Sequence, residues 1–484
     1  MQHVARRPFY VVSWYRSVPR WGWWIVGGGI TIGLVSPHPF LSLAGWLLLP
    51  VLVRLTWRTG ESPIPTVGVL MLWISAMLPV IFFSGFKGIP LDQVANTYST
   101  RFSTEMLGPA SWLSLAATLM VALGIRLGLS RLPPIPWQRF WVEAQRLDPE
   151  KLLLAYGGAY ALNFFFGGGA LLGLGGIAQL TIALTAIRWA FFFLLVVAVL
   201  VQREQYSLLV LAITIEITLG ILGFWGSFRD FFFVFAVAYV AARPRMSARE
   251  ARGLLLMLLF VLTIGLFWQS VKGDFRDFVT QGETSMSSQV TFEEEAQMMW
   301  VLIRETEPSD LINATDITVE RIAVKTFFFG EVLEYIPEYR PYDGGAGWRA
   351  GLEHIFKPRL FFPDKPSLDA SAITNRYIAR TVTGDGVASF AIGYIGESYA
   401  DFGPIGMFIP IFLVGLGLGL MYRFFLSYPS IKIMGVAFAS AFLLARIGGL
   451  HDIPQMLGRT VTEFVAMATV LYFFGPIIYK YIRR

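Results

Sequence analysis

Five basic residues crowd into 24 positions of the sequence, between prolines that hold the backbone in place. They are Lys357, Arg359, Lys365, Arg376 and Arg380, and Asp364 lies among them. A backbone fixed by proline lowers the entropy cost of ordering a site before an anionic ligand arrives. A basic patch that touches lipid headgroups is the alternative for any single residue. As a set, the spacing favours an anion site.

Two carboxylates follow, Glu397 and Asp401, and they are four residues apart. In a helix they lie on one face. A carboxylate buried at a membrane boundary has a raised proton affinity and can serve as a general base. For Asp401, an acidic charge at a helix start explains the residue equally well. We therefore predict Glu397 as the base, beside Tyr399, with His354 as the second candidate.

Two arginines fall at or within apolar runs, where a charge is costly unless it faces a cavity or a partner. Arg229 follows Gly226-Ser227-Phe228, and its fork of donors matches phosphate oxygens; an Arg229–Asp230 pair that anchors a turn is the alternative. Arg446 lies within a later run. His451 and Asp452 could add to the same site, although an interfacial turn is the plainer interpretation.

The elements that must carry these residues are transmembrane helices. Of 484 residues 55% are apolar and only 15% are charged, against roughly 25% charged in a soluble domain. Runs long enough to span a bilayer occur twelve times, at 23–37, 39–57, 65–85, 109–127, 152–166, 178–201, 207–226, 228–242, 253–270, 402–422, 431–450 and 460–481. The sequence therefore predicts an all-α polytopic membrane protein with about twelve spans.

Basic residues collect in the loops of one side, which places both termini in the cytoplasm by the positive-inside rule. That pattern indicates topology and excludes nucleic-acid binding. There is no cysteine, so thiolate metal sites and thiol catalysis are excluded. The glycine-rich stretches 167–176 and 415–419 could open lateral grooves between helices.

The predicted domains are 1–270, with about nine spans, then the segment 271–401, then 402–484, with about three spans. From Lys272 to Asp385 the segment has 12 basic and 19 acidic residues, and by this topology it lies outside. It is far longer than a connecting loop. We predict amphipathic helices over 290–303 and 316–332, the second with a membrane-dipping Phe327–Phe329.

Several of these motifs together resemble the bacterial oligosaccharide repeat-unit polymerases, the Wzy-type enzymes, and more loosely the O-antigen ligases. The resemblance rests on Pro358-Arg359 with Pro363-Asp364-Lys365-Pro366, on Gly396 to Gly403, and on Gly226 to Arg229. Arg340 also precedes Gly351 by the spacing noted in such polymerases.

The resemblance implies a GT-C-like, inverting, metal-independent glycosyltransferase of the bacterial inner membrane with no cofactor. It would join repeat units carried on undecaprenyl diphosphate at the periplasmic face, among membrane lipids and alongside a flippase and a chain-length regulator. Preorganised cations would stabilise the diphosphate leaving group. The candidates are Arg229, Arg340, Arg359, Lys365, Arg376, Arg380 and Arg446.

Other classes stay open at this point. A flippase or transporter would use intramembrane Arg188, Glu216, Arg229 and Arg446 along a path, but such proteins show related halves and short loops, and the sequence has no internal repeat. A scaffold subunit of an export complex would tolerate loss of Arg359 or Glu397. Polymerase and ligase differ in acceptor, which the sequence does not reveal.

Overall fold

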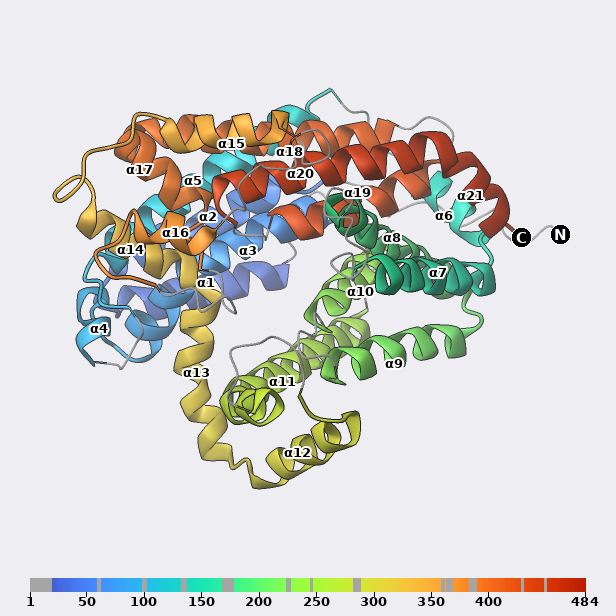
Figure 1. Cartoon of the computed structure of the whole chain (residues 1–484), viewed down its shortest axis with the longest axis horizontal. Helices are drawn as coiled ribbons and strands as arrows, with labels where there is room; N and C mark the ends of the chain where they lie inside the picture. The colour runs from blue at the N-terminus through green and yellow to red at the C-terminus, as the bar shows by residue number, and fades with distance from the viewer. Residues whose placement is uncertain are drawn as a thin grey trace.

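The described part of the chain is built from helices joined by turns and loops (Figure 1). The computed structural model describes residues 20–58, 62–97, 102–131, 137–167, 178–222, 228–243, 247–281, 289–357, 362, 369–382, 390–427, 431–447 and 451–484. Within these ranges there is no strand, and the only β-bridge joins Leu147 to Arg483.

The first part of the chain, up to the polar segment, contains these helices: α1 (Arg20–Leu34), α2 (Pro39–Thr56), α3 (Ile64–Pro79), α4 (Val94–Thr97), α5 (Leu107–Leu129), α6 (Trp137–Gln145), α7 (Pro149–Gly167), α8 (Ala178–Gln202), α9 (Tyr206–Leu222), α10 (Phe228–Ala242) and α11 (Ala248–Thr280). The polar segment adds α12 (Phe292–Glu305), α13 (Pro308–Ile322), α14 (Val324–Tyr335), α15 (Ala346–Phe356), α16 (Ala370–Asn375) and α17 (Tyr394–Gly406). The last helices are α18 (Phe408–Ser427), α19 (Lys432–Ile447), α20 (Ile453–Thr469) and α21 (Gly475–Ile482).

Six helical stretches of the described chain are long and apolar enough to cross a membrane. They are Pro39–Thr56, Ile64–Phe86, Leu107–Leu129, Arg252–Thr280, Phe408–Ser427 and Ile453–Ile482. Five shorter apolar helices accompany them, and each of the twelve predicted runs overlaps at least one helix. The protein is therefore a helical membrane protein, whereas the count of twelve spans stays a prediction.

Helices α5 and α18 pack closely through glycines on both sides. A Cβ atom added at Gly415 would lie 2.3 Å from the carbonyl oxygen of Val121, and one added at Gly124 would lie 2.3 Å from that of Phe412. Gly128 and Gly419 make the next contact along the same seam. Small residues four apart let membrane helices approach closely. The predicted groove at 415–419 is thus a tight seam, while 168–177 lies outside the described residues.

Helix α11 continues past the domain boundary predicted at residue 270 and ends at Thr280. Its second half packs against α12 through a small apolar core of Val271, Phe275, Val279, Met299 and Leu302. Thr291 begins α12 with a capping box to Glu294, which confirms the helix predicted over 290–303. We call residues 269–322, without the undescribed stretch 282–288, the α11–α13 arm.

The helix predicted over 316–332 is two helices, α13 and α14, which meet at Ala323. The three phenylalanines 327–329 are buried inside the protein, at 1–2% exposure, and not in lipid. Phe327 and Phe328 contact the ring of Phe102. Their burial fixes α14 against the bundle, and α14 in turn carries the elements of the candidate site.

Candidate functional site

Two of the predicted cations meet on one carboxylate that the motifs did not single out. Arg340 donates from Nη2 to Asp343 Oδ1 at 3.1 Å. Arg376 forms an ion pair with the same carboxylate, with its Nη2 3.0 Å from Asp343 Oδ2. The hydroxyl of Tyr377 donates to the same Oδ2 at 2.9 Å. The side chains of Arg340 and Arg376 remain 30% and 48% exposed. We call Arg340, Asp343, Arg376 and Tyr377 the guanidinium cluster.

Backbone turns hold the cluster in place. The amide of Asp343 donates to the carbonyl of Ala400, and that of Gly344 donates to the carbonyl of Asp401. Gly344 and Gly345 have φ of +61° and +88°, which favours glycine because it lacks a Cβ atom. The loop after α14 is thereby attached to α17, and Arg340 and Asp343 are held in one turn.

The acid Asp401 stabilises the start of α15. Its Oδ1 and Oδ2 accept the backbone N–H groups of Gly347 and Trp348 at 3.1 and 2.9 Å. These are donors that the first turn of a helix leaves without a partner. Burial raises the pKa of Asp401, and the two amide donors oppose that effect. The interpretation of Asp401 as a helix-start charge is supported, although the helix that it caps is α15 and not its own α17.

A second group of charges lies deeper and joins α14, α17 and the start of α20. Glu397 is 2% exposed; its Oε2 accepts the backbone N–H of Ile453 at 3.1 Å, and its Oε1 has no partner. Asp452 is fully buried and caps α20 by accepting the N–H of Gln455, while its Oδ2 has no partner. We call Glu397, Asp452 and Lys325 the buried charge cluster.

Burial dominates the protonation of this cluster. Burial and, to a smaller extent, the neighbouring carboxylate of Asp452 raise the pKa of Glu397 to about 8. Burial lowers the pKa of Lys325 to about 8, while Glu397 and Asp452 oppose that shift. Lys325 donates to the carbonyl of Ala391, and no salt bridge of 4 Å or less joins it to either acid. Close to neutral pH, the cluster therefore favours a neutral Glu397.

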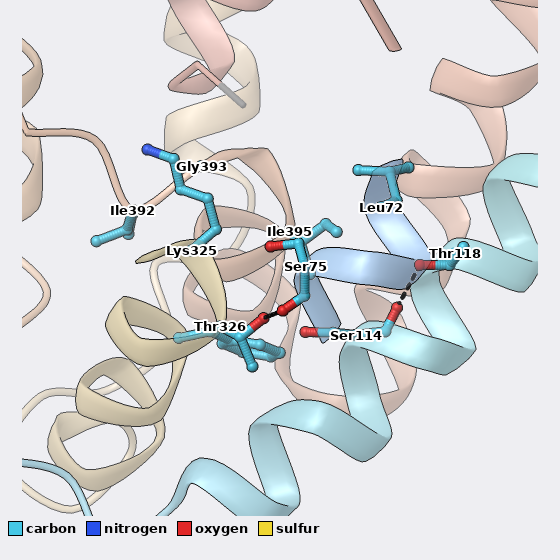
Figure 2. Close-up of a pocket in the computed structure, with 10 residues that line it drawn as sticks. Leu72, Ser75, Ser114, Thr118, Lys325, Thr326, Ile392, Gly393 and Ile395 are labelled. Carbon is cyan, nitrogen blue, oxygen red and sulfur yellow. Dashed lines mark hydrogen bonds between the residues drawn. The ribbon is translucent and has the colours of Figure 1, made fainter. Parts of the chain in front are cut away.

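A small cavity adjoins Lys325 between α3, α5, α14 and the start of α17 (Figure 2). It offers about 20 Å³ to a water-sized molecule, which is room for roughly one water. Ser75 and Ser114 are among its polar lining, with Thr326 donating to the carbonyl of Ser75 and Thr118 to that of Ser114 (Figure 2). A saccharide or a diphosphate does not fit there.

The other predicted residues are dispersed. Arg380 pairs with Glu331 at 2.8 Å and lies over the rings of Phe102 and Phe328, so it is not part of the guanidinium cluster. Tyr399 donates its hydroxyl to the carbonyl of Ile336. His354, half-buried in the last turn of α15, faces α20 close to Gly458.

Arg359, Asp364 and Lys365 lie outside the described residues. The anion site predicted over residues 357–380 therefore stays a prediction. Arg229 and Arg446 lie in α10 and α19, in stretches whose side chains are not described. Among the described residues, no three His, Cys, Asp or Glu side chains gather as metal ligands.

Two of the charges predicted to lie within the membrane, Glu216 and Arg188, are engaged within the helix bundle. The hydroxyl of Tyr156 on α7 donates to Glu216 on α9. The guanidinium of Arg188 lies over the rings of Tyr160 and Trp189, at 5.0 and 4.5 Å from their centroids. Cation–π contacts of this kind offset part of the cost of a buried charge. Both side chains thus make contacts that link neighbouring helices.

Sequence reasoning missed Asp343, Tyr377 and Lys325. Asp343 lies three residues after Arg340, and Tyr377 follows Arg376 directly. Their closeness in sequence to these two arginines is the signal that could have identified them. Lys325 carries no local signal.

The cluster has two guanidiniums at a partly exposed surface, and its own carboxylate Asp343 holds them in place as preorganised donors. A second carboxylate, Asp401, lies close enough to interact with Arg376. The two guanidiniums can bind an anion with several oxygens, such as a diphosphate.

A family model described as "Domain of unknown function (DUF8712)" matches residues 148–423, more than half of the chain. The matched region contains the guanidinium cluster and Glu397, and it ends before Asp452. No curated protein and no solved structure matches the chain.

Proposed function

The chain belongs to the family described as a domain of unknown function (DUF8712), and we propose that it is a membrane glycosyltransferase. Its substrate would be an oligosaccharide repeat unit carried on undecaprenyl diphosphate, and its product a longer lipid-linked glycan. The guanidinium cluster is the single observation that carries this proposal. Two guanidiniums are held within 3.1 Å of one carboxylate and remain partly exposed, as a clamp for a diphosphate requires.

The reaction is a displacement at the anomeric carbon of the donor sugar. A hydroxyl oxygen of the acceptor forms the new bond to that carbon, and the bond from the carbon to the diphosphate oxygen breaks. The diphosphate leaves with the bonding electron pair, and its developing charge is stabilised by Arg340 and Arg376. As in the resembling polymerases, this gives inversion without a metal.

The acceptor proton must pass to a base, and the clamp provides none. Asp343 already accepts hydrogen bonds from Arg340 and Tyr377 and forms an ion pair with Arg376, and Asp401 accepts two hydrogen bonds from backbone amides. Glu397 is 2% exposed and an acceptor hydroxyl cannot reach it in this conformation. We therefore assign the base to His354, which is partly exposed on α15, and give Glu397 a positioning role between α17 and α20.

The proposed topology has about twelve spans in a GT-C-like arrangement, with both termini in the cytoplasm of a bacterium. The segment 271–401 then lies on the periplasmic face of the inner membrane, where lipid-linked repeat units are exposed. A flippase would supply the substrate, and a chain-length regulator would act on the product. Fusing a periplasm-specific reporter within residues 383–389 and a second one at the C-terminus tests the orientation.

The activity is tested by reconstituting the purified chain in proteoliposomes. The substrate is undecaprenyl-diphosphate-linked repeat unit extracted from source cells that lack this chain. A ladder of longer lipid-linked glycans is the expected result. Transfer only to a lipid core acceptor would replace the polymerase proposal by a ligase. Unchanged substrate, or movement across the membrane without bond formation, would contradict both.

A further inference from the structure

The α11–α13 arm contains a hollow that the guanidinium cluster does not use. It measures about 350 Å³ and lies between α11, α12 and α13, a volume within the range of small-molecule sites. Figure 1 shows these three helices together, at the end of the molecule away from α15 and α18. A site there would contact part of a substrate other than its diphosphate.

The floor of the hollow is apolar and well packed. Val271, Leu302 and Ala314 line it and are only 4%, 7% and 2% exposed. Val271 and Leu302 also belong to the apolar core that joins α11 to α12. The shape of the hollow is therefore set by helix packing.

The rim is polar and consists mainly of groups that accept hydrogen bonds. It has two amides, Gln269 and Asn313, and three carboxylates, Asp274, Glu305 and Asp310. An ionised carboxylate only accepts hydrogen bonds, whereas an amide both donates and accepts. This set suits a ligand with many hydroxyl or amino donors and one apolar face.

The charges on the rim exclude two other kinds of ligand. No Lys or Arg is among the described residues that line the hollow, so an anion would meet three carboxylates on its rim. The described acids also do not gather as the ligands of a metal ion. A neutral or amino-bearing polyol remains, which has C–H groups for the floor and hydroxyls for the rim.

We propose that this hollow binds one saccharide unit of the substrate glycan, a neutral or amino sugar and not a uronic acid. The inference rests on the proposed function for the identity of the glycan as substrate. It also gives a role to the excess of acidic residues in the first part of the segment 271–401. The glycan would extend from the clamp toward the arm.

Saturation-transfer difference NMR on the full chain in nanodiscs tests this site directly. The probes are N-acetylglucosamine, glucosamine and glucuronate. The variant Asn313→Trp fills the hollow from its rim, and Ile312→Trp is the matched control, because Ile312 is 71% exposed on the same helix and does not line the hollow. We expect saturation transfer to the first two sugars, at least tenfold weaker in Asn313→Trp and unchanged in Ile312→Trp.

Three results would overturn the proposal. They are no saturation transfer to either expected sugar, equal saturation transfer to glucuronate, and equal saturation transfer in Asn313→Trp and the native chain. Reconstitution of the native chain with lipid-linked substrate separates this proposal from the proposed function. If the hollow binds sugar but the chain is not a glycosyltransferase, the NMR saturation-transfer signals are seen, while reconstituted native protein forms no glycan. If the chain is a glycosyltransferase but the hollow binds no sugar, glycan forms, and Asn313→Trp removes no saturation-transfer signal.

Discussion

Helix α17 contacts two clusters of charge that differ in burial and in how their acids are hydrogen-bonded. On the side of Asp401, the backbone of α17 holds the loop of the guanidinium cluster. The acid of that cluster, Asp343, accepts two side-chain hydrogen bonds and pairs with Arg376, and its cations are partly exposed. On the side of Glu397, the charges are buried, and both Glu397 and Asp452 keep an oxygen without a partner.

This difference suggests that the guanidinium cluster binds the ligand and that the buried charge cluster stabilises the fold. The partly exposed cations Arg340 and Arg376 are held in place by Asp343 and can still contact an anionic ligand. Their removal should therefore lower the rate of glycosyl transfer. Buried acids with raised pKa values cannot contact a large substrate, so their removal should act on stability and its dependence on pH.

Loss of one clamp cation should have the largest effect. In Arg376→Gln we expect the rate of transfer to fall about 10²–10³-fold, as when one preorganised donor to a developing oxyanion is removed. The fold should persist, because an ion pair at 48% exposure contributes roughly 0–1 kcal/mol. Initial rates of ladder formation in proteoliposomes measure this. Arg349→Gln, an exposed arginine of α15, is the control and should keep the native rate; a native rate in Arg376→Gln would remove the clamp from the reaction.

The glycine seam between α5 and α18 should be the next most sensitive position. Gly415→Ala places a Cβ atom 2.3 Å from a backbone oxygen of α5, and overpacking of this kind costs roughly 1–3 kcal/mol. Gly417→Ala on the same helix is the control, since nothing lies within 4 Å of its added Cβ atom. Thermal unfolding in detergent compares the two. Equal melting temperatures would mean that α5 and α18 are not packed as closely as described.

The buried charge cluster predicts an unusual dependence of stability on pH. Because the pKa of Glu397 is raised from 4.5 to about 8, the native state binds more protons than the unfolded state between those values. Stability from this group therefore falls as pH rises through that window. Lys325, whose pKa is lowered from 10.5 to about 8, acts oppositely: its contribution rises with pH between about 8 and 10.5.

The variant Glu397→Gln should flatten the loss of stability between about pH 5 and pH 8. Melting temperatures across that range, with Glu353→Gln as an exposed control at 60% exposure, measure the change. A slope that survives in Glu397→Gln would show that other groups cause it.

Removal of the α15 cap should have the smallest effect. Asp401→Ala takes away the acceptor of two N–H groups, and the loss of a helix cap costs about 1 kcal/mol. Hydrogen exchange of residues 346–350 should accelerate while that of α18 stays unchanged. Equal protection in the first turn of α15 would show that the cap is dispensable.

The sequence predicts helices well because apolar runs and capping residues are local signals. The long helices and α12 follow from hydropathy and from the capping box of Thr291 with Glu294. The break at Ala323 was not predicted, since the apolar pattern continues across it. Phe327–Phe329 were wrongly assigned to lipid because periodicity does not distinguish a protein neighbour from a lipid one.

The candidate site is predictable only in part. Arg340, Arg376, Glu397 and Asp401 were identified by residue type and spacing, but their partners are tertiary contacts. Asp343 and Arg376 lie 33 residues apart in sequence, and the burial of Glu397 comes from α20, beyond the segment that contains it. Lys325 resembles any surface lysine of an amphipathic helix until the fold encloses it.

The central claim is that the guanidinium cluster binds a lipid diphosphate, and calorimetry tests it most directly. The affinity of the full chain in nanodiscs for geranyl diphosphate is compared with that of Arg340→Gln/Arg376→Gln and of Arg349→Gln. We expect the double variant to bind at least tenfold more weakly, and Arg349→Gln to bind as the native chain does. Equal affinity of the native chain and the double variant would contradict the claim.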